Sequence, residues 1–546
     1  MKFLRLFGGD HALSLRAIVV MAAISGVCDA LLLVIINRAA ELGAGAGQRG
    51  LLLATYLVTF VLYVYGQRYA YRRMLVHVEK SLHTMKLRIA NKVRRVELRY
   101  LEEVGGSAAF AALTRDSGLV AQAAQVIVTA LQASLVVVIC LVYIAWLSPI
   151  SFVFALLLFG LAVPPLLAHY RVSLQEMQAT GSKENTFFES FASVLAGFKQ
   201  IKLNGAEARD IYANLTRLSE QARDLKAGST ARLMFDGLVY ETLFYLLLLI
   251  VVFILPIFSL ADSAVVSKLT ATLLFLLNPF GAMLVAIPVF VDTEVALDEL
   301  FEMERRLDAA QPPVAARCAP VDQFSTVAAR GLGFSYRDVS GRVLFTSGPH
   351  DFVLRAGETV FLVGGNGAGK STLLKLLAGL YVPDAGELLL NGAPVRREEI
   401  EAYRSLFAVV FADFHLFDRL YGMDGIDADA VRDWLNRVDL AHKTDYVDGR
   451  FTNINLSTGQ RKRLAFVVAV LSRRPIFIFD ELAADQDPEF RARFYTQMLP
   501  ELKARGHTLI IVSHDERYFH CADRILRLDG GRVVDVAASH DTERAA

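Results

Sequence analysis

Six apolar stretches, each near the length of a membrane-spanning helix, precede residue 295. A helix needs roughly 20 mostly apolar residues to cross the hydrocarbon core of a membrane. The chain of 546 residues is 54% hydrophobic and 21% charged, so it is more apolar than soluble domains usually are. We therefore expect a polytopic α-helical membrane domain over residues 1–295. Its predicted helices cover residues about 15–37, 51–69, 118–146, 150–170, 234–260 and 266–291.

Basic residues concentrate in two long connections, between the second and third stretches and between the fourth and fifth. The other connections are short. Since positive charge marks the cytoplasmic side of a membrane protein, both termini and both long connections are expected in the cytoplasm. Few helix breakers occur in these connections, which favours membrane helices that continue beyond the bilayer.

The overall charge and the cysteines exclude several classes of protein. Lys and Arg total 57 and Asp and Glu total 56, so no global basic field exists to bind nucleic acid. The four cysteines are scattered without CxxC spacing. This excludes a disulfide scaffold and a cysteine zinc site.

The last part of the chain predicts a soluble α/β domain that binds a nucleotide. Residues 296–324 resemble a linker in composition, and from 325 to 546 strand and helix patterns alternate. A buried strand at 360–363 leads into a phosphate-binding loop of the form GxxxxGK[ST]. In this loop Lys370 should reach the β- and γ-phosphates of ATP, and Ser371 should bind Mg²⁺. The loop comprises Gly364, Gly365, Asn366, Gly367, Ala368, Gly369, Lys370, Ser371 and Thr372.

A second apolar strand, at 476–479, ends in two carboxylates. Asp480 stands where a P-loop protein places a Mg²⁺ partner. Glu481 follows and is positioned to polarise the attacking water. The alternative is that Asp480 and Glu481 have no catalytic role and are simply two acidic residues on the surface at the end of a strand.

The order of motifs in this half resembles an ATP-binding cassette, and the six preceding stretches resemble the membrane half of an ABC exporter. The segment 456–460, Leu-Ser-Thr-Gly-Gln, resembles the ABC signature, with Thr458 where glycine is commoner. Three single residues also match the family. Tyr336 corresponds to the aromatic residue that stacks on adenine, His514 to the switch histidine and Asp487 to the D-loop aspartate.

The resemblance implies a homodimer in a bacterial inner membrane, with two cassettes that face each other head to tail. Each P-loop would then meet the partner's signature, so that Ser457, Gly459 and Gln460 complete the partner's ATP site. Glu481, His514 and Lys370 would carry out hydrolysis, and closure of the cassettes would drive alternating access. Residues 98–102 and 186–190 are candidates for short coupling helices.

One position departs from the family pattern. Ala412 stands where the Q-loop glutamine is expected, and alanine cannot bind a metal. We hypothesise that the neighbouring Asp413 helps to order the Mg²⁺ site.

The segments 411–417 and 480–488, with the Ser-Thr-Gly signature, resemble the exporter branch that carries cyclic peptides and peptide siderophores, including pyoverdine precursors and syringomycin. The expected cargo is therefore a cyclic peptide, a peptide siderophore or its precursor. A periplasmic or outer-membrane partner could assist. The alternatives are a flippase for lipids or lipid-linked intermediates, a multidrug exporter, a siderophore importer with an exporter fold, and an ATP-gated regulator.

Polar residues within apolar stretches are costly and often face a cavity. Asp29, Asp236, Glu241 and Asn278 are therefore candidates for a cargo cavity. Asp29 could instead form a structural pair. Asp236 and Glu241 could instead lie in a solvated extension of their helix.

Overall fold

The computed structural model divides the chain into two compact units. One comprises Met1–Arg94 and Gly105–Ala309, and the other comprises Arg95–Val104 and Ala310–Ala546. The described residues are 12–41, 46–104, 113, 117–258, 262–311, 324–338, 340–423 and 425–536. Some side chains within these ranges, chiefly between 159 and 181, are outside the description.

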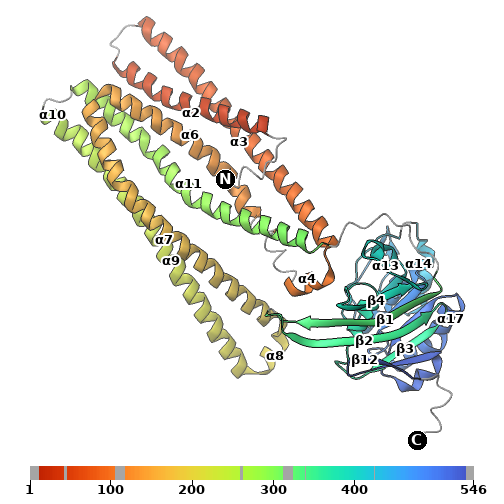
Figure 1. Ribbon diagram of the computed structural model, residues 1–546. Coiled ribbons are helices and arrows are strands. Elements are labelled where there is room, and N and C mark those ends of the chain that lie inside the picture. The colour runs from red at the N-terminus through yellow and green to blue at the C-terminus, as the bar shows by residue number, and fades with distance from the viewer. Residues whose placement is uncertain are drawn as a thin grey trace. The chain divides into compact units, whose positions relative to one another are not determined.

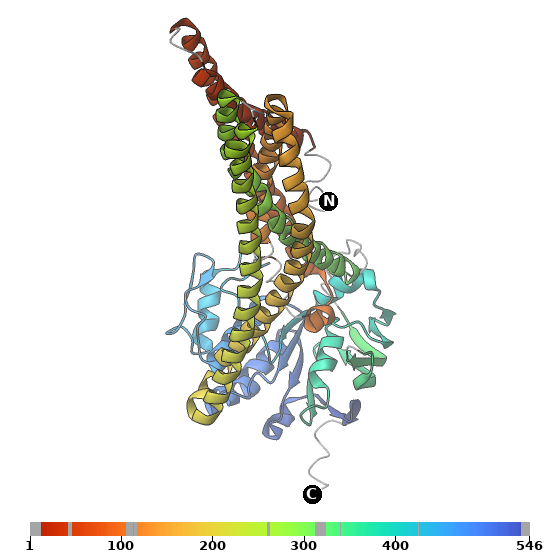
Figure 2. The same cartoon turned by 90° about the vertical axis from the view of Figure 1, so that its left-hand side faces the viewer.

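The first unit consists of long helices (Figure 1). Helix α6 packs against α2 and α11, and α7 runs beside α9 in both views (Figures 1 and 2). Apolar side chains such as Leu57 and Val142 remain exposed on these helices, as is expected of surfaces that face lipid. The long helices are α2 (Ala12–Glu41), α3 (Ala46–Arg95), α6 (Ser117–Leu147), α7 (Pro149–Ala196), α9 (Gly205–Leu249) and α11 (Ser263–Ala309).

Five of the predicted membrane stretches lie in helices that are long and apolar enough to span a membrane. These helices are Leu15–Ala40, Gln48–Arg95, Ser117–Leu147, Gly205–Ile257 and Ser263–Ala309. The predicted stretch at 150–170 lies in α7 and is helical throughout. Its described apolar part is Pro149–Leu158. A π-helical turn at Ile250–Ile254 and the short α10 (Leu255–Ile257) extend α9. Helix α11 continues through Pro279 and Pro288 to Ala309.

A short helix, α8 (Phe198–Leu203), separates α7 from α9. The Asn204 side chain caps α9 by accepting hydrogen bonds from the amides of Ala206 and Glu207 at 3.1 and 3.3 Å. The prediction of a short helix at 186–190 is wrong, because that segment lies inside α7. The N-cap signal at Asn204 would have located the break correctly.

The second unit contains a six-stranded sheet in the order β12-β11-β3-β10-β9-β6 and a four-stranded antiparallel sheet in the order β2-β1-β4-β5. In the larger sheet only β12 is antiparallel to its neighbour. Its strands are β3 (Thr359–Gly364), β6 (Phe407–Val410), β9 (Ile476–Asp480), β10 (Thr508–Val512), β11 (Arg524–Asp529) and β12 (Arg532–Val536). The smaller sheet has β1 (Thr326–Arg337), β2 (Val343–Arg355), β4 (Ala385–Leu390) and β5 (Ala393–Pro394).

Both faces of the larger sheet are buried, which explains why its central strands are apolar throughout. In β3, Phe361 and Val363 join one hydrophobic core, whereas Val360 and Leu362 join the other. The helices that complete the unit are α12 (Lys370–Leu377), α13 (Ile400–Arg404), α14 (Ala428–Arg437), α15 (Thr458–Leu471), α16 (Pro488–Arg493) and α17 (Leu499–Ala504). A two-stranded hairpin, β7 (Tyr446–Val447) with β8 (Arg450–Phe451), precedes α15.

The short helix α4 (Leu98–Val104) lies in the second unit although its sequence belongs to the connection between α3 and α6. This confirms a short helix at the predicted segment 98–102. Leu98 packs against one of the two cores. Glu102 accepts hydrogen bonds from Lys375 Nζ at 2.7 Å and from the Tyr381 hydroxyl. Burial and the hydrogen bond to Glu102 raise the pKa of Tyr381, so its hydroxyl stays a donor.

Replacement of Glu102 by alanine should loosen α4. Two charge-assisted hydrogen bonds are lost, and each is worth about 1.5–3 kcal/mol. We expect the amides of residues 98–104 to exchange with deuterium roughly tenfold or more faster, as measured by mass spectrometry. Glu387→Ala is the matched control, because Glu387 pairs with Arg330 on the small sheet. Equal exchange in Glu102→Ala and the native protein would contradict the described contact.

Candidate functional site

The phosphate-binding loop joins the end of β3 to the start of α12. Lys370 is buried, and its Nζ donates to the carbonyls of Gly364 and Gly365 at 2.9 and 3.0 Å. Gly369 has a φ of +96°. A Cβ there would lie 3.2 Å from both the Phe345 ring and Ser347 Oγ, so only glycine fits without strain. This is a loop whose backbone can approach a phosphate closely, at a helix N-terminus.

Ser371 and Asp480 meet at this loop as the sequence predicted. Ser371 Oγ donates to Asp480 Oδ2 at 3.1 Å. Asp480 is 3% exposed, and this burial raises the pKa of its carboxyl group. The hydrogen bond from Ser371, a further one from the Ala412 amide and the charge of Lys370 oppose the shift. Two hard oxygen donors beside a phosphate-binding loop fit Mg²⁺, which takes few protein ligands and completes its shell with phosphate and water.

Within the described residues, no third metal-ligating side chain joins Ser371 and Asp480. Asp413 is exposed. No group of three or more His, Cys, Asp or Glu side chains within the described ranges could hold a metal ion. The departure at Ala412 thus has a structural counterpart, because its backbone amide, not a side chain, contacts Asp480. A metal-binding role for Asp413 stays a proposal.

Glu481 and His514 lie together, one residue beyond β9 and two beyond β10. The register pairs Val512 with both Asp480 and Leu362, so the carboxyl ends of three parallel strands meet at one edge. His514 Nε2 lies 3.1 Å from Glu481 Oε1. Both side chains line a cavity of about 240 Å³. A carboxylate and an imidazole that line a cavity together can orient a water and a phosphate.

Tyr336 lies at the end of β1, half-buried beside the helix that follows the P-loop. Its hydroxyl is 3.3 Å from Thr372 Oγ1 and 3.2 Å from the Tyr381 hydroxyl. The ring packs edge-on against Tyr381. The predicted adenine-stacking residue thus stands next to the P-loop helix, and Tyr381 links it to Glu102 of α4.

The signature segment forms the N-terminus of α15. Ser457 is the N-cap, and its Oγ accepts from the Gln460 amide at 3.4 Å, while Gln460 Oε1 accepts from the Ser457 amide at 3.2 Å. Ser457 and Thr458 are exposed. Among the described residues, no hydrogen bond connects 457–460 to the P-loop of the same chain. Thr458 and Gly459 begin α15, so their amides belong to the first turn, whose N–H groups have no partner within the helix and attract anions.

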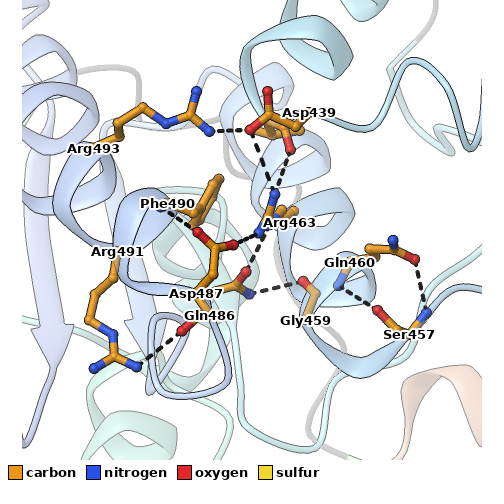
Figure 3. A network of polar contacts seen from close by, with 11 residues as sticks. Asp439, Ser457, Gly459, Gln460, Arg463, Gln486, Asp487, Phe490, Arg491 and Arg493 are labelled. Atoms are coloured by element: carbon orange, nitrogen blue, oxygen red, sulfur yellow. Dashed lines mark hydrogen bonds and ion pairs between the residues drawn. The ribbon is translucent and has the colours of Figure 1, made fainter.

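A network that sequence analysis missed ties the signature to the loop after Glu481 (Figure 3). Gln486 Nε2 donates to the Gly459 carbonyl at 2.9 Å, and Gln486 Oε1 accepts from Arg463 Nε at 2.8 Å. Arg463 also pairs with Asp487 and stacks on Phe490 at 4.1 Å. Asp487 in turn caps α16 through the Phe490 amide. The sequence analysis singled out Gly459 and Asp487 of this network but not the residues that join them, Arg463 and Gln486.

The four candidates for a cargo cavity are not brought together by any described contact. Asp29 is partly buried, and Glu241 and Asn278 are exposed. The side chain of Asp236 lies outside the described residues. The nearest described contact joins α9 to α11, where Tyr240 donates to the Leu277 carbonyl at 3.0 Å and stacks on Phe280.

A nucleotide cassette joined to a bundle of membrane-spanning helices defines an ATP-driven membrane transporter. Residues 349–484 match the family described as ABC transporter. The chain is 32% identical over 476 residues to the ATP-binding protein SyrD of Pseudomonas syringae pv. syringae, with 84% of each chain covered. It is 27% identical over 479 residues to an ATP-dependent lipid A-core flippase of Thiobacillus denitrificans, with 84% of this chain and 81% of the flippase covered.

A solved structure of a bacterial Atm1-family ABC exporter with ATP bound has the same fold. The TM-score is 0.76 at 18% identity, and the match covers 96% of this chain and 94% of the exporter. The chain therefore belongs to the ABC transporter family, as an exporter-type half-transporter whose cassette hydrolyses ATP. The predicted fold class, a polytopic helical membrane domain fused to a P-loop cassette, is confirmed.

Replacement of Asp480 by asparagine should stabilise the cassette while hydrolysis is lost. The pKa of Asp480 is raised in the folded state, so its ionised form opposes folding above that pKa. Without nucleotide and divalent cation at neutral pH, we expect Tm to rise by roughly 2–4 °C. The gain should vanish below the ordinary pKa of aspartate, where both states are protonated. Scanning calorimetry checks this. The exposed Asp529→Asn is the control, and a lower Tm at neutral pH would contradict the argument.

Proposed function

We propose that this chain acts as a homodimer that exports a cyclic peptide, a peptide siderophore or a siderophore precursor across a bacterial inner membrane. The observation that carries the dimer is the exposed N-terminus of α15. Its signature residues make no described contact with the P-loop of their own chain. A second chain placed head to tail would receive Ser457, Gly459 and Gln460 at its ATP site, with Asp487 at the interface between the cassettes.

In this proposal, several residues of the nucleotide site share the work of ATP hydrolysis. Lys370 exchanges its two carbonyl partners for phosphate oxygens of ATP. Glu481 orients and polarises the attacking water, and His514 contacts both the carboxylate and the γ-phosphate. Ser371 and Asp480 would hold Mg²⁺, which would neutralise charge on the phosphates when bound. The adenine stacks on Tyr336.

The peptide cargo is supported by the resemblance of segments 411–417 and 480–488 to the cyclic-peptide exporter branch. The similarity to SyrD along 84% of both chains agrees with that branch. Asp29, Glu241 and Asn278 remain candidates for the cargo cavity, together with Asp236. The similarity to a lipid A-core flippase favours one competitor, a lipid flippase. Both termini and the cassette would lie in the cytoplasm.

The proposal is tested by transport into inside-out vesicles that contain the purified chain. We expect ATP-dependent accumulation of a fluorescent cyclic lipopeptide, and at least roughly 100-fold slower uptake with Glu481→Gln, because the general base is removed. Flipping of a fluorescent lipid by the same preparation is measured in parallel. Flipping without peptide uptake would replace the peptide proposal by the flippase. Peptide uptake that survives Glu481→Gln would contradict the role of Glu481.

The Mg²⁺ role of Asp413 has a separate test. If Asp413 helps to order the metal, Asp413→Ala should raise the Mg²⁺ concentration for half-maximal ATP hydrolysis by roughly tenfold. Titration of ATPase activity with Mg²⁺ measures this. Asp418→Ala, a change on the same loop at a residue that pairs with Arg450, serves as the control. Identical Mg²⁺ dependence in the native protein and Asp413→Ala would rule out the role.

A further inference from the structure

Glu481 occupies a backbone conformation that residues with side chains rarely adopt. Its φ is +52°, in the left-handed region that favours glycine. Such a conformation persists only where the surrounding contacts fix it. Its amide donates to the Val512 carbonyl at 3.3 Å, and its carbonyl accepts from the Ala484 amide at 3.2 Å. These bonds tie Glu481 to β10 and to the turn that follows.

A buried lysine provides a third contact. Lys462 is 6% exposed, and its Nζ donates to the Glu481 carbonyl at 2.9 Å. The same ammonium pairs with Asp485 at 2.7 Å. A buried lysine is retained at a cost unless its charge is compensated. Here Asp485 compensates the charge of Lys462, and the second partner is the backbone carbonyl of Glu481, the proposed hydrolytic residue.

Lys462 belongs to α15, the helix whose N-terminus carries the signature. The helix is joined to the same loop at two more places (Figure 3). Gln486 holds the Gly459 carbonyl, and Arg463 holds Gln486 and Asp487. A Cβ at Gly459 would lie 2.9 Å from the Asp485 carbonyl oxygen, so helix and loop are in close contact. Any displacement of the signature end must move the loop that begins at Glu481.

We propose that Lys462 is a positioning residue that sets the backbone of Glu481 and couples it to the signature of the same chain. The inference rests on the proposed hydrolytic role of Glu481. In the dimer, the signature serves the partner's nucleotide and Glu481 serves the chain's own. Lys462 therefore transmits engagement at one ATP site to the hydrolytic carboxylate of the other.

The test compares ATP hydrolysis by the full-length protein in lipid nanodiscs. Lys462→Met keeps the length of the side chain and removes its donors. We expect kcat to fall roughly tenfold, because a misplaced base loses most of its effect, while KM for ATP changes less than about twofold. The Hill coefficient for ATP should fall toward one.

Two control variants accompany this test. Lys462→Arg should retain most of kcat. Lys503→Met, which breaks the Lys503 pair with Asp523 elsewhere in the cassette, should change nothing.

A second measurement separates positioning from a structural role. ATP binding is measured with a fluorescent nucleotide in the Glu481→Gln background, where Lys462→Met should leave affinity unchanged. An unchanged kcat in Lys462→Met, or weaker binding in proportion to lost turnover, would overturn the proposal. If Lys462→Met does not fold, Asp485→Asn decides, since it should lower kcat in the same direction without altering KM. Turnover that survives Glu481→Gln alone would instead refute the role of Glu481.

Discussion

Burial of the larger sheet on both faces is the constraint on which the cassette depends. Because β3, β9 and β10 are covered by two cores, their residues alternate between the cores. A register slip would move side chains that are packed in one core into the other and would draw the polar residues at the strand ends into the apolar interior. The fixed register places the P-loop, Asp480 and His514 at one edge. The position of the polar site residues is therefore set by the hydrophobic packing of the strands that end at them.

At that edge of the sheet, backbone carbonyls and amides hold several of the functional side chains in place. The carbonyls of Gly364 and Gly365 hold Lys370, the Ala412 amide contacts Asp480, and the Gly459 and Glu481 carbonyls receive Gln486 and Lys462. Glycine at 459 also keeps this close approach open, because a Cβ there would lie 2.9 Å from the Asp485 carbonyl oxygen. Positive side chains from α15 thus organise a site that is otherwise rich in acids, without adding another ligand for the nucleotide of their own chain.

The contiguous motifs of the site could be predicted from sequence, because a P-loop or a strand that ends in Asp-Glu places its own residues. The contacts of Arg463, Gln486 and Lys462 could not, since they arise only when α15 packs on the loop after β9. In the membrane half, five of the six predicted stretches lie in helices that are long and apolar enough to span a membrane. The short helix between α7 and α9 was predicted at 186–190 and lies instead at 198–203. The continuous helical pattern of the sequence on both sides hides the capping residue Asn204. Hydropathy also cannot tell which side of a helix a residue such as Asp29 or Glu241 occupies.

The attachment of α4 bears on the order in which the protein is made. Glu102 and Lys375 are 273 residues apart in the chain, and Leu98 covers part of a core built mostly from residues beyond 326. Since a ribosome releases the amino-terminal part first, α4 exists before any strand of the cassette. The cassette therefore packs part of one core and two side chains, Lys375 and Tyr381, against a segment that long membrane-type helices flank in the sequence on both sides. Insertion of those helices and completion of the soluble domain thus involve the same short stretch of chain.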